Sequence, residues 1–407
     1  MKKTARIILC LLLVFVFILS LSACHKKKNN ESEPGAWDDP IVLENCAIEH
    51  ETKFGGVYIK ITIDDFNAMG FRFGDSVDVI FSNGFKVEDI PYFNGFYVDM
   101  LEPLLVGYPG YPYIRVGYNN GEDMWNTGDL QATDSTSPTL WSVADVTAHD
   151  TATVILKKAG KYILEQEAMD IHYTDTQDGR TNEVFANFRA VNTIATMKQN
   201  TLYRSCSPID NQHNRAHICD DLIEAAGVEF IMDLADSEDE LAELFAVDDF
   251  DSPYFKSLAD DDNVVALSMS SAYTKQPFSS KLVQGFRAIV ASGKSKILVH
   301  CVEGKDRTGF VCVVIEALCG ATYEEIVNDY MLTYDNYYGI NKESDYSKYD
   351  IIMQKNLYPM LRYITGNDPN VDITSVNYNQ YTNDFLRSIG LYQYQINQLK
   401  DIFKIQD

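Results

Sequence analysis

A cysteine and an arginine stand close together in one stretch of this sequence, with only five residues, Val302 to Asp306, between Cys301 and Arg307. The stretch, residues 300–309, reads His-Cys-Val-Glu-Gly-Lys-Asp-Arg-Thr-Gly and lies between two apolar runs, a short one before it and a long one after it. This order predicts a strand, a tight loop and a helix. A loop of this kind directs successive backbone N–H groups inward, and the helix N-terminus adds partial positive charge, so the stretch is suited to bind an anion.

The residue types in the loop suit nucleophilic chemistry on such an anion. The positive field favours the thiolate form of Cys301, which is the nucleophile. The planar guanidinium of Arg307 can grip two oxygens of a tetrahedral anion at once. Gly304 and Gly309 allow the loop and the helix start to approach the ligand closely. Thr308 is placed to donate a hydrogen bond to the sulfur when it leaves.

The pattern His-Cys-x-x-Gly-Lys-Asp-Arg-Thr-Gly resembles the signature loop of the cysteine-dependent phosphatases, in particular the bacterial tyrosine and lipid phosphatases of dual-specificity-like type. The resemblance implies a phosphocysteine intermediate on Cys301, with Arg307 on the phosphate and no metal or other cofactor. A buried cysteine in an ordinary turn would explain neither Lys305 nor Arg307. The residues expected to bind the phosphate are Val302, Glu303, Gly304, Lys305, Thr308 and Gly309.

A general acid must protonate the leaving oxygen. The resemblance favours Asp306, because the related phosphatases carry an aspartate at this place in the loop. Asp233 and Asp236, at a predicted strand end, are alternatives, and a role as helix caps is equally compatible with them. We expect His300 to support the loop and the thiolate. Lys305 could engage a second phosphate, as the resemblance to lipid phosphatases implies.

The resemblance extends from residue 182 to residue 407, where strands and helices alternate. Residues 187–191 and 202–205 resemble two further motifs of the same family. That family commonly has Asp-Leu-Arg at the next strand, whereas this chain has Asp233-Leu234-Ala235. The arginine is absent here, so its role in the family is not carried over. The fold that the pattern and the resemblance imply is an α/β phosphatase domain with a central sheet flanked by helices.

Residues 38–168 form a different, mostly β region. Runs rich in β-branched and aromatic residues at 57–63, 76–81 and 151–156 predict strands, and glycines and prolines punctuate the region between them. Short strands with such turns predict a small barrel or sandwich. The pattern at 71–79 resembles the β-barrel domain of the S-adenosylmethionine hydroxide adenosyltransferases, whose catalytic half has no counterpart here, so their activity is not carried over.

The N-terminus reads as a targeting segment. Lys2, Lys3 and Arg6 precede the apolar residues 7–19, and Leu21-Ser22-Ala23-Cys24 resembles a lipobox. We therefore expect a signal peptide over residues 1–23, a lipid (palmitate included) on Cys24, and a polar tether over 24–37. A transmembrane anchor is the alternative, but the apolar stretch is short for a span of roughly 17–25 residues. Either reading places the protein on the extracytoplasmic face of the cell membrane.

The net charge limits the classes of partner that the protein could bind. The chain of 407 residues has a net charge of −25, which argues against a nucleic-acid partner and means that any attraction for a phosphorylated substrate must be local to the loop. Six cysteines besides Cys10 and Cys24 are too few for a disulfide scaffold. The sequence predicts a membrane-anchored phosphatase whose candidate substrates are phosphotyrosine, phosphoserine or phosphothreonine in proteins, or a phospholipid. A non-catalytic surface module that binds phosphate ligands and sulfur transfer through a Cys301 persulfide are the alternatives.

Overall fold

The computed structural model describes residues 40–131, 150–172 and 175–406. The predicted signal peptide, the lipidation site at Cys24 and the whole tether lie outside the described residues. Within the described residues, no helix is long and apolar enough to cross a membrane.

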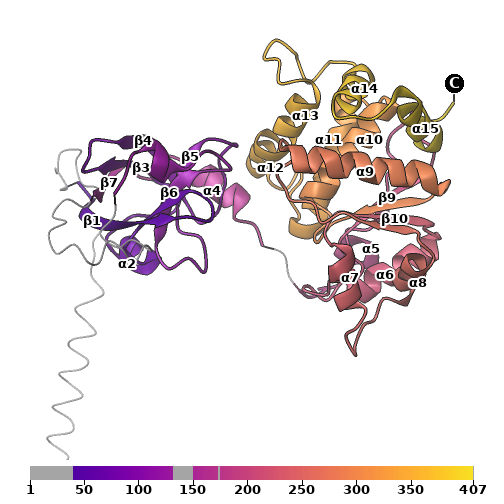
Figure 1. The fold of residues 1–407 in the computed structure, drawn as a ribbon, viewed down its shortest axis with the longest axis horizontal. Coiled ribbons are helices and arrows are strands. Elements are labelled where there is room, and N and C mark those ends of the chain that lie inside the picture. Colours follow the sequence, from indigo (N-terminus) through magenta and orange to yellow (C-terminus); the bar gives the residue numbers. More distant parts are fainter. Residues whose placement is uncertain (1–39, 132–149, 173–174, 407) are drawn as a thin grey trace, which may run out of the picture. The chain divides into compact units, whose positions relative to one another are not determined.

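In the described residues 40–172, seven strands close into a barrel in the order β1-β2-β6-β5-β4-β3-β7 (Figure 1). Neighbouring strands are antiparallel except for β4 and β5, which run parallel. The predicted barrel-like region is therefore confirmed. The strands are β1 (Val42–Glu51), β2 (Gly56–Ile59), β3 (Ser76–Phe81), β4 (Lys86–Phe93), β5 (Pro103–Val106), β6 (Ile114–Tyr118) and β7 (Thr151–Lys158).

Alternation along the strands fills the barrel. In β3 the side chains of Val77, Val79 and Phe81 are buried, as the period of two requires. The expected strand at 57–63 is shorter in the structure, because Thr62 caps the helix that follows by accepting a hydrogen bond from the N–H of Asp65. Three short helices accompany the barrel: α2 (Ile63–Ala68), α3 (Met124–Thr127) and α4 (Ile163–Met169).

In the described residues 175–406, five strands form one sheet in the order β11-β10-β12-β9-β8. Strands β11, β10, β12 and β9 run parallel, and the edge strand β8 pairs with β9 antiparallel. The carboxyl ends of the parallel strands therefore meet at one edge of the sheet, where α/β folds commonly bind ligands. The strands are β8 (Arg189–Ala190), β9 (Leu202–Ser205), β10 (Phe230–Asp233), β11 (Val264–Ala266) and β12 (Ile297–His300).

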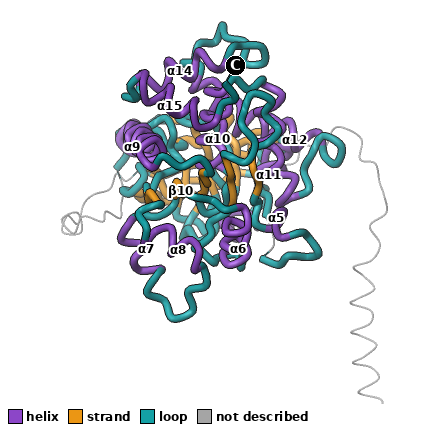
Figure 2. Tube along the Cα trace, turned by 90° about the vertical axis from the view of Figure 1, so that its right-hand side faces the viewer, coloured by secondary structure: helices purple, strands orange, loops and turns teal. Residues whose placement is uncertain are grey.

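Helices cover both faces of this sheet, as Figures 1 and 2 show. Leu298 of β12 faces α6, α7 and α8, whereas Ile297 and Val299 face the core that α9, α10, α11 and the C-terminal helices share. Burial on both faces explains why the strands read as continuous apolar runs. The helices are α5 (Asn182–Phe185), α6 (Ala216–Ala226), α7 (Glu238–Leu244), α8 (Pro253–Asp260), α9 (Gln276–Ser292), α10 (Asp306–Cys319), α11 (Tyr323–Tyr338), α12 (Tyr346–Ile352), α13 (Tyr358–Ile364), α14 (Tyr378–Ser388) and α15 (Gln393–Phe403).

Local signals in the sequence mark several of these ends. Helix α6 ends at Gly227, which has φ +65°. Helix α11 begins with a capping box between Thr322 and Glu325. Residues 346–364 form α12, a π-helical turn at Met353–Leu357 and α13, which has a proline in its first turn.

Candidate active site

The loop that follows β12 connects the sheet edge to α10. Cys301 comes directly after the last residue of β12, and α10 begins at Asp306. In the register of the sheet, His300 lies between Asp233 of β10 and Ser205 of β9. The predicted order of strand, loop and helix is therefore present, and the residues that follow β9, β10 and β11 surround the loop.

Cys301 and Arg307 line one pocket of about 420 Å³, together with Asp306, Val302 and Glu303. The opposite wall of this pocket comes from the segment after β11, residues 269–271. The guanidinium of Arg307 donates from Nη1 to two carbonyl oxygens at strand ends, Leu234 at 3.2 Å and Met269 at 3.0 Å. These bonds hold Arg307 beside the thiol and leave its other N–H groups for an anion.

Three successive carbonyl groups of the loop are held from outside. Val302 O accepts from the N–H of Ser207 at 2.9 Å, and Glu303 O accepts from the hydroxyl of Tyr337 at 2.7 Å. Gly304 O accepts from Arg204 Nη2 at 3.0 Å. In a planar trans peptide the N–H points opposite to the C=O. The N–H groups of residues 303, 304 and 305 therefore face the other way, which is the arrangement an anion site needs.

Only glycine fits at position 304. Its φ is +67°, and a Cβ built there would lie 2.0 Å from the carbonyl oxygen of Ser205. The backbone of β9 and the loop thus touch directly. Glycine is required at position 309 for a different reason. A Cβ there would lie 2.8 Å from the ring of Tyr330, so this glycine lets α10 approach α11.

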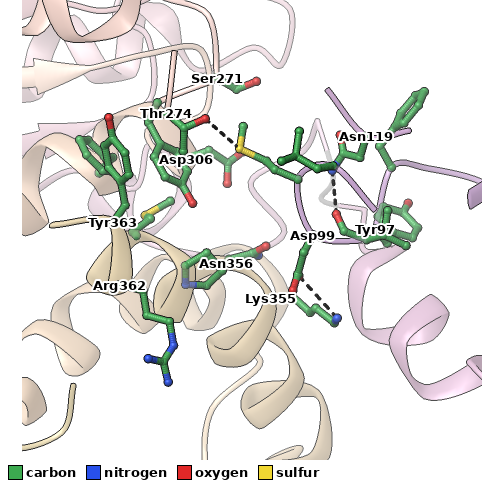
Figure 3. A pocket seen from close by; sticks show the side chains of 18 of the residues that line it. Tyr97, Asp99, Asn119, Ser271, Thr274, Asp306, Lys355, Asn356, Arg362 and Tyr363 are labelled. Carbon is green, nitrogen blue, oxygen red and sulfur yellow. Dashed lines mark hydrogen bonds and ion pairs between the residues drawn. The ribbon is translucent and has the colours of Figure 1, made fainter. Parts of the chain in front are cut away.

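Lys305 and Asp306, the two charged residues between Gly304 and Arg307, differ in their surroundings. Asp306 is exposed, lines the pocket, and lies among Ser271, Thr274 and Tyr363 in Figure 3. Lys305 is not part of that lining among the described residues. Its Nζ lies 2.9 Å from Glu303 Oε2. Although burial disfavours the charge, the carboxylates of Asp306 and Glu303 raise the pKa of Lys305, so it stays protonated.

A comparison with known proteins assigns this domain. A family model described as the tyrosine phosphatase family matches residues 182–403, which is more than half of the chain. The chain belongs to the tyrosine phosphatase family. A tyrosine-protein phosphatase from Nostoc commune is 31% identical over 137 residues, which cover 31% of this chain and 47% of that relative. The chain therefore spans about half the length of this relative.

In the tyrosine phosphatase domain, His300 is fully buried and its pKa is lowered by burial to about 4, so the ring is neutral. Its Nε2 lies 3.7 Å from Asp233 Oδ1, which is too long for a hydrogen bond. The ring packs edge-on against Phe255. These contacts make His300 part of the support beneath Cys301.

Asp233 and Asp236 lie beside this support rather than in the pocket lining. Asp233 Oδ1 accepts from the N–H groups of Ala235 at 2.8 Å and Asp236 at 3.2 Å, so it stabilises the turn after β10. Burial raises the pKa of Asp233 to about 7. Burial and the neighbouring charge of Asp233 raise the pKa of Asp236 to about 7 as well.

Thr308 lies in the first turn of α10 and is fully buried. Among the described residues its Oγ1 has no hydrogen-bond partner. A hydroxyl in this position can donate to a neighbouring acceptor without first breaking another bond.

Sequence reasoning did not assign the residues that hold the loop from outside. Asn187 and Arg204 lie in the two motifs noted at 187–191 and 202–205, but the motifs alone did not indicate a role. Asp329 and Tyr337 gave no signal, because an aspartate and a tyrosine on an amphipathic helix are compatible with an exposed face. In the structure both are buried: Asp329 pairs with Arg204, and Tyr337 donates to a loop carbonyl.

Proposed function

We propose that this protein hydrolyses phosphate monoesters, with phosphotyrosine as the preferred substrate and phosphoserine, phosphothreonine or phosphoinositides as further candidates. The observation that carries the proposal is the pocket that Cys301 and Arg307 share at the start of α10. The loop N–H groups opposite the three anchored carbonyls supply the remaining donors for an anion with three equatorial oxygens.

The reaction has two steps. The Cys301 sulfur attacks phosphorus in line with the leaving oxygen, so an S–P bond forms while the P–O bond breaks. A general acid gives its proton to that oxygen, and the alcohol or phenol leaves. Water then attacks phosphorus and gives a proton back to the same carboxylate. The S–P bond breaks and inorganic phosphate leaves. Arg307 and the loop N–H groups hold the charge on the equatorial oxygens throughout.

We assign the general acid to Asp306. It lines the same pocket as Cys301. Asp233, by contrast, is fully buried, and its carboxylate already accepts hydrogen bonds from two backbone N–H groups. Asp306→Asn should lower kcat more for alkyl phosphates than for p-nitrophenyl phosphate, whose phenolate leaves without a proton. The matched control is Asp236→Asn, which removes an acid of the neighbouring turn. A larger leaving-group effect in the control would transfer the role to Asp236.

The decisive experiment is hydrolysis of phosphotyrosine peptides, phosphoserine peptides and phosphoinositides by the protein and by Cys301→Ser. We expect turnover of phosphotyrosine that disappears in the variant, and a radiolabelled phosphoenzyme in the protein but not in the variant. Absence of turnover on every ester, with inorganic phosphate still bound, would favour a non-catalytic phosphate-binding module. Sulfur transfer from thiosulfate without ester hydrolysis would favour the persulfide chemistry.

We also propose that a lipid on Cys24 anchors the protein to the extracytoplasmic face of the cell membrane. The lipobox and the positively charged, apolar segment before it support this. Labelling of bacteria with a clickable palmitate analogue should mark the protein but not Cys24→Ala, and added protease should digest it in spheroplasts. Protection from the protease would place the domain in the cytoplasm and contradict the proposal.

A further inference from the structure

Two arginines and two carboxyl groups are buried together beneath the phosphate loop. Arg204 Nη1 lies 2.6 Å from Asp329 Oδ2, and Arg189 Nε lies 3.0 Å from Asp329 Oδ1. Arg204 is fully buried and Asp329 nearly so. Burial of three charges is costly even when they are paired, and well-packed apolar residues often stabilise a fold as much. A role of this cluster other than stability is therefore worth testing.

The cluster reaches the loop through Arg204. One arm of its guanidinium binds Asp329, and the other donates to Gly304 O at 3.0 Å. Asn187 Nδ2 also approaches Gly304 O, at 3.4 Å. Arg189 binds Asp329 and Asn187 but, among the described residues, donates to no loop carbonyl. Arg204 is thus the direct link between the buried carboxylate and the loop.

The charges in the cluster do not cancel. Both arginines are protonated, and although burial alone would raise the pKa of Asp329, the two guanidinium groups hold that pKa well below its usual range. Glu316 of α10 is fully buried nearby, and burial together with the charge of Asp329 raises its pKa well above the usual range, so it is neutral. Two positive charges against one negative charge leave a net positive charge under the loop.

We infer that Arg204, held in place by Asp329, is a positioning residue for the phosphate site. Its bond to Gly304 O turns the N–H of the Gly304–Lys305 peptide toward the pocket and brings the uncompensated positive charge of the cluster beneath the bound phosphate. Tyr337 does the same for the preceding peptide through Glu303 O. The inference rests on the proposed phosphatase reaction.

Arg204→Lys is the test variant. Lysine keeps the charge, but a single ammonium cannot span Asp329 and the loop carbonyl as the fork does. We expect kcat to fall by about 10-fold or more with KM changed little, since loss of one oriented donor costs up to about 10²–10³ in rate. We also expect weaker inhibition by tungstate and alkylation of Cys301 by iodoacetamide that begins at higher pH.

Arg189→Lys is the matched control, because it weakens the same buried cluster without removing a donor from Gly304 O. It should lower the melting temperature as Arg204→Lys does but leave kcat and the alkylation profile close to those of the parent protein. Equal effects of the two substitutions on kcat and alkylation would mean that Arg204 acts only through stability, and the inference would fall.

Two further variants keep the test decisive. If Arg204→Lys does not fold, Tyr337→Phe removes one hydroxyl only, and kcat should still fall several-fold at unchanged KM; full activity would contradict the inference.

Glu316→Gln should leave kcat and alkylation unchanged if Glu316 is neutral, and a clear gain in either would show that the cluster carries no net charge. Alkylation and tungstate binding need no ester, so they test the loop even if the parent protein hydrolyses none.

Discussion

At the scale of single residues, the site depends on a few backbone contacts that tolerate almost no added atoms. Gly304 faces the carbonyl of Ser205, and the carbonyls of Val302, Glu303 and Gly304 are each held by a donor from another segment. The loop backbone therefore places the thiol of Cys301, and the guanidinium of Arg307 is held in addition by its own bonds to Leu234 O and Met269 O.

Gly304→Ala should abolish activity and destabilise the domain, because the methyl group would lie 2.0 Å from Ser205 O at a φ of +67°. Chemical denaturation and hydrolysis of p-nitrophenyl phosphate would measure both effects. Gly320→Ala is the control: it has φ +94° at the other end of α10 but nothing within 4 Å. The control should lose about 1 kcal/mol of stability and keep its kcat. Equal losses of activity would show that backbone strain, not the contact with Ser205, matters.

The buried imidazole of His300 gives the domain a pH dependence. Its folded pKa of about 4 is below the unfolded value of 6.5, so its contribution to stability is present above pH 6.5 and is lost as pH falls toward 4. At 1.36 kcal/mol per pKa unit, the full loss is about 3 kcal/mol.

Urea unfolding at pH 7 and pH 4.5 should therefore show a larger fall in stability for the protein than for His300→Asn, which has no titrating ring. Asp233 and Asp236, whose raised pKa values give the opposite slope between about pH 4 and 7, titrate in both proteins and largely cancel in the comparison. Parallel pH profiles would mean that folding does not shift the pKa of His300.

At the scale of elements, α11 is the helix that supports the loop. Asp329, Thr333 and Tyr337 are four residues apart and share one buried face, from which they reach Arg189, Arg204 and the loop. Helix α10 lies against α11 because Gly309 admits the ring of Tyr330. The orientation of the loop thus depends on how α11 packs.

Thr322→Ala removes the N-cap of α11, at the end of the helix away from the loop contacts. We expect a loss of about 1 kcal/mol in the free energy of unfolding with kcat unchanged, because the cap stabilises only the first turn. Glu324→Ala, on the exposed side of the same turn, is the control and should change stability by a few tenths of a kcal/mol. A fall in kcat for Thr322→Ala would show that the loop senses the far end of the helix.

At the scale of the whole molecule, the barrel and the tyrosine phosphatase domain have separate hydrophobic cores. The buried cluster inside the barrel includes Val79 and Val116, and it has no residue in common with the two clusters on either face of the sheet. This separation of the cores predicts that each part unfolds as a unit of its own.

Calorimetry of the protein should accordingly show two unfolding transitions. Tungstate, as a phosphate analogue, should raise the temperature of only one of them, because a ligand stabilises the unit that binds it. Arg307→Ala, which removes a phosphate-binding group, should abolish the shift without merging the transitions. A single transition that moves as a whole with tungstate would show that the two parts unfold together.

The local sequence was sufficient to predict the loop, the strand before it and the helix after it, because an anion site at a helix start needs only neighbouring residues of the right types. Cys301, Arg307 and Asp306 all line the pocket as that reading requires. The barrel was likewise predicted from short strands separated by turn residues.

Only the tertiary structure decided what holds the loop. Arg204 and Asp329 are 125 positions apart and meet because β9 lies beside β12 and α11 packs against α10. Periodicity shows that a helix has two faces, but it does not show which polar residue is turned inward to meet a buried arginine. That choice depends on long-range packing, and in this protein it determines the direction of the N–H groups on which the proposed chemistry depends.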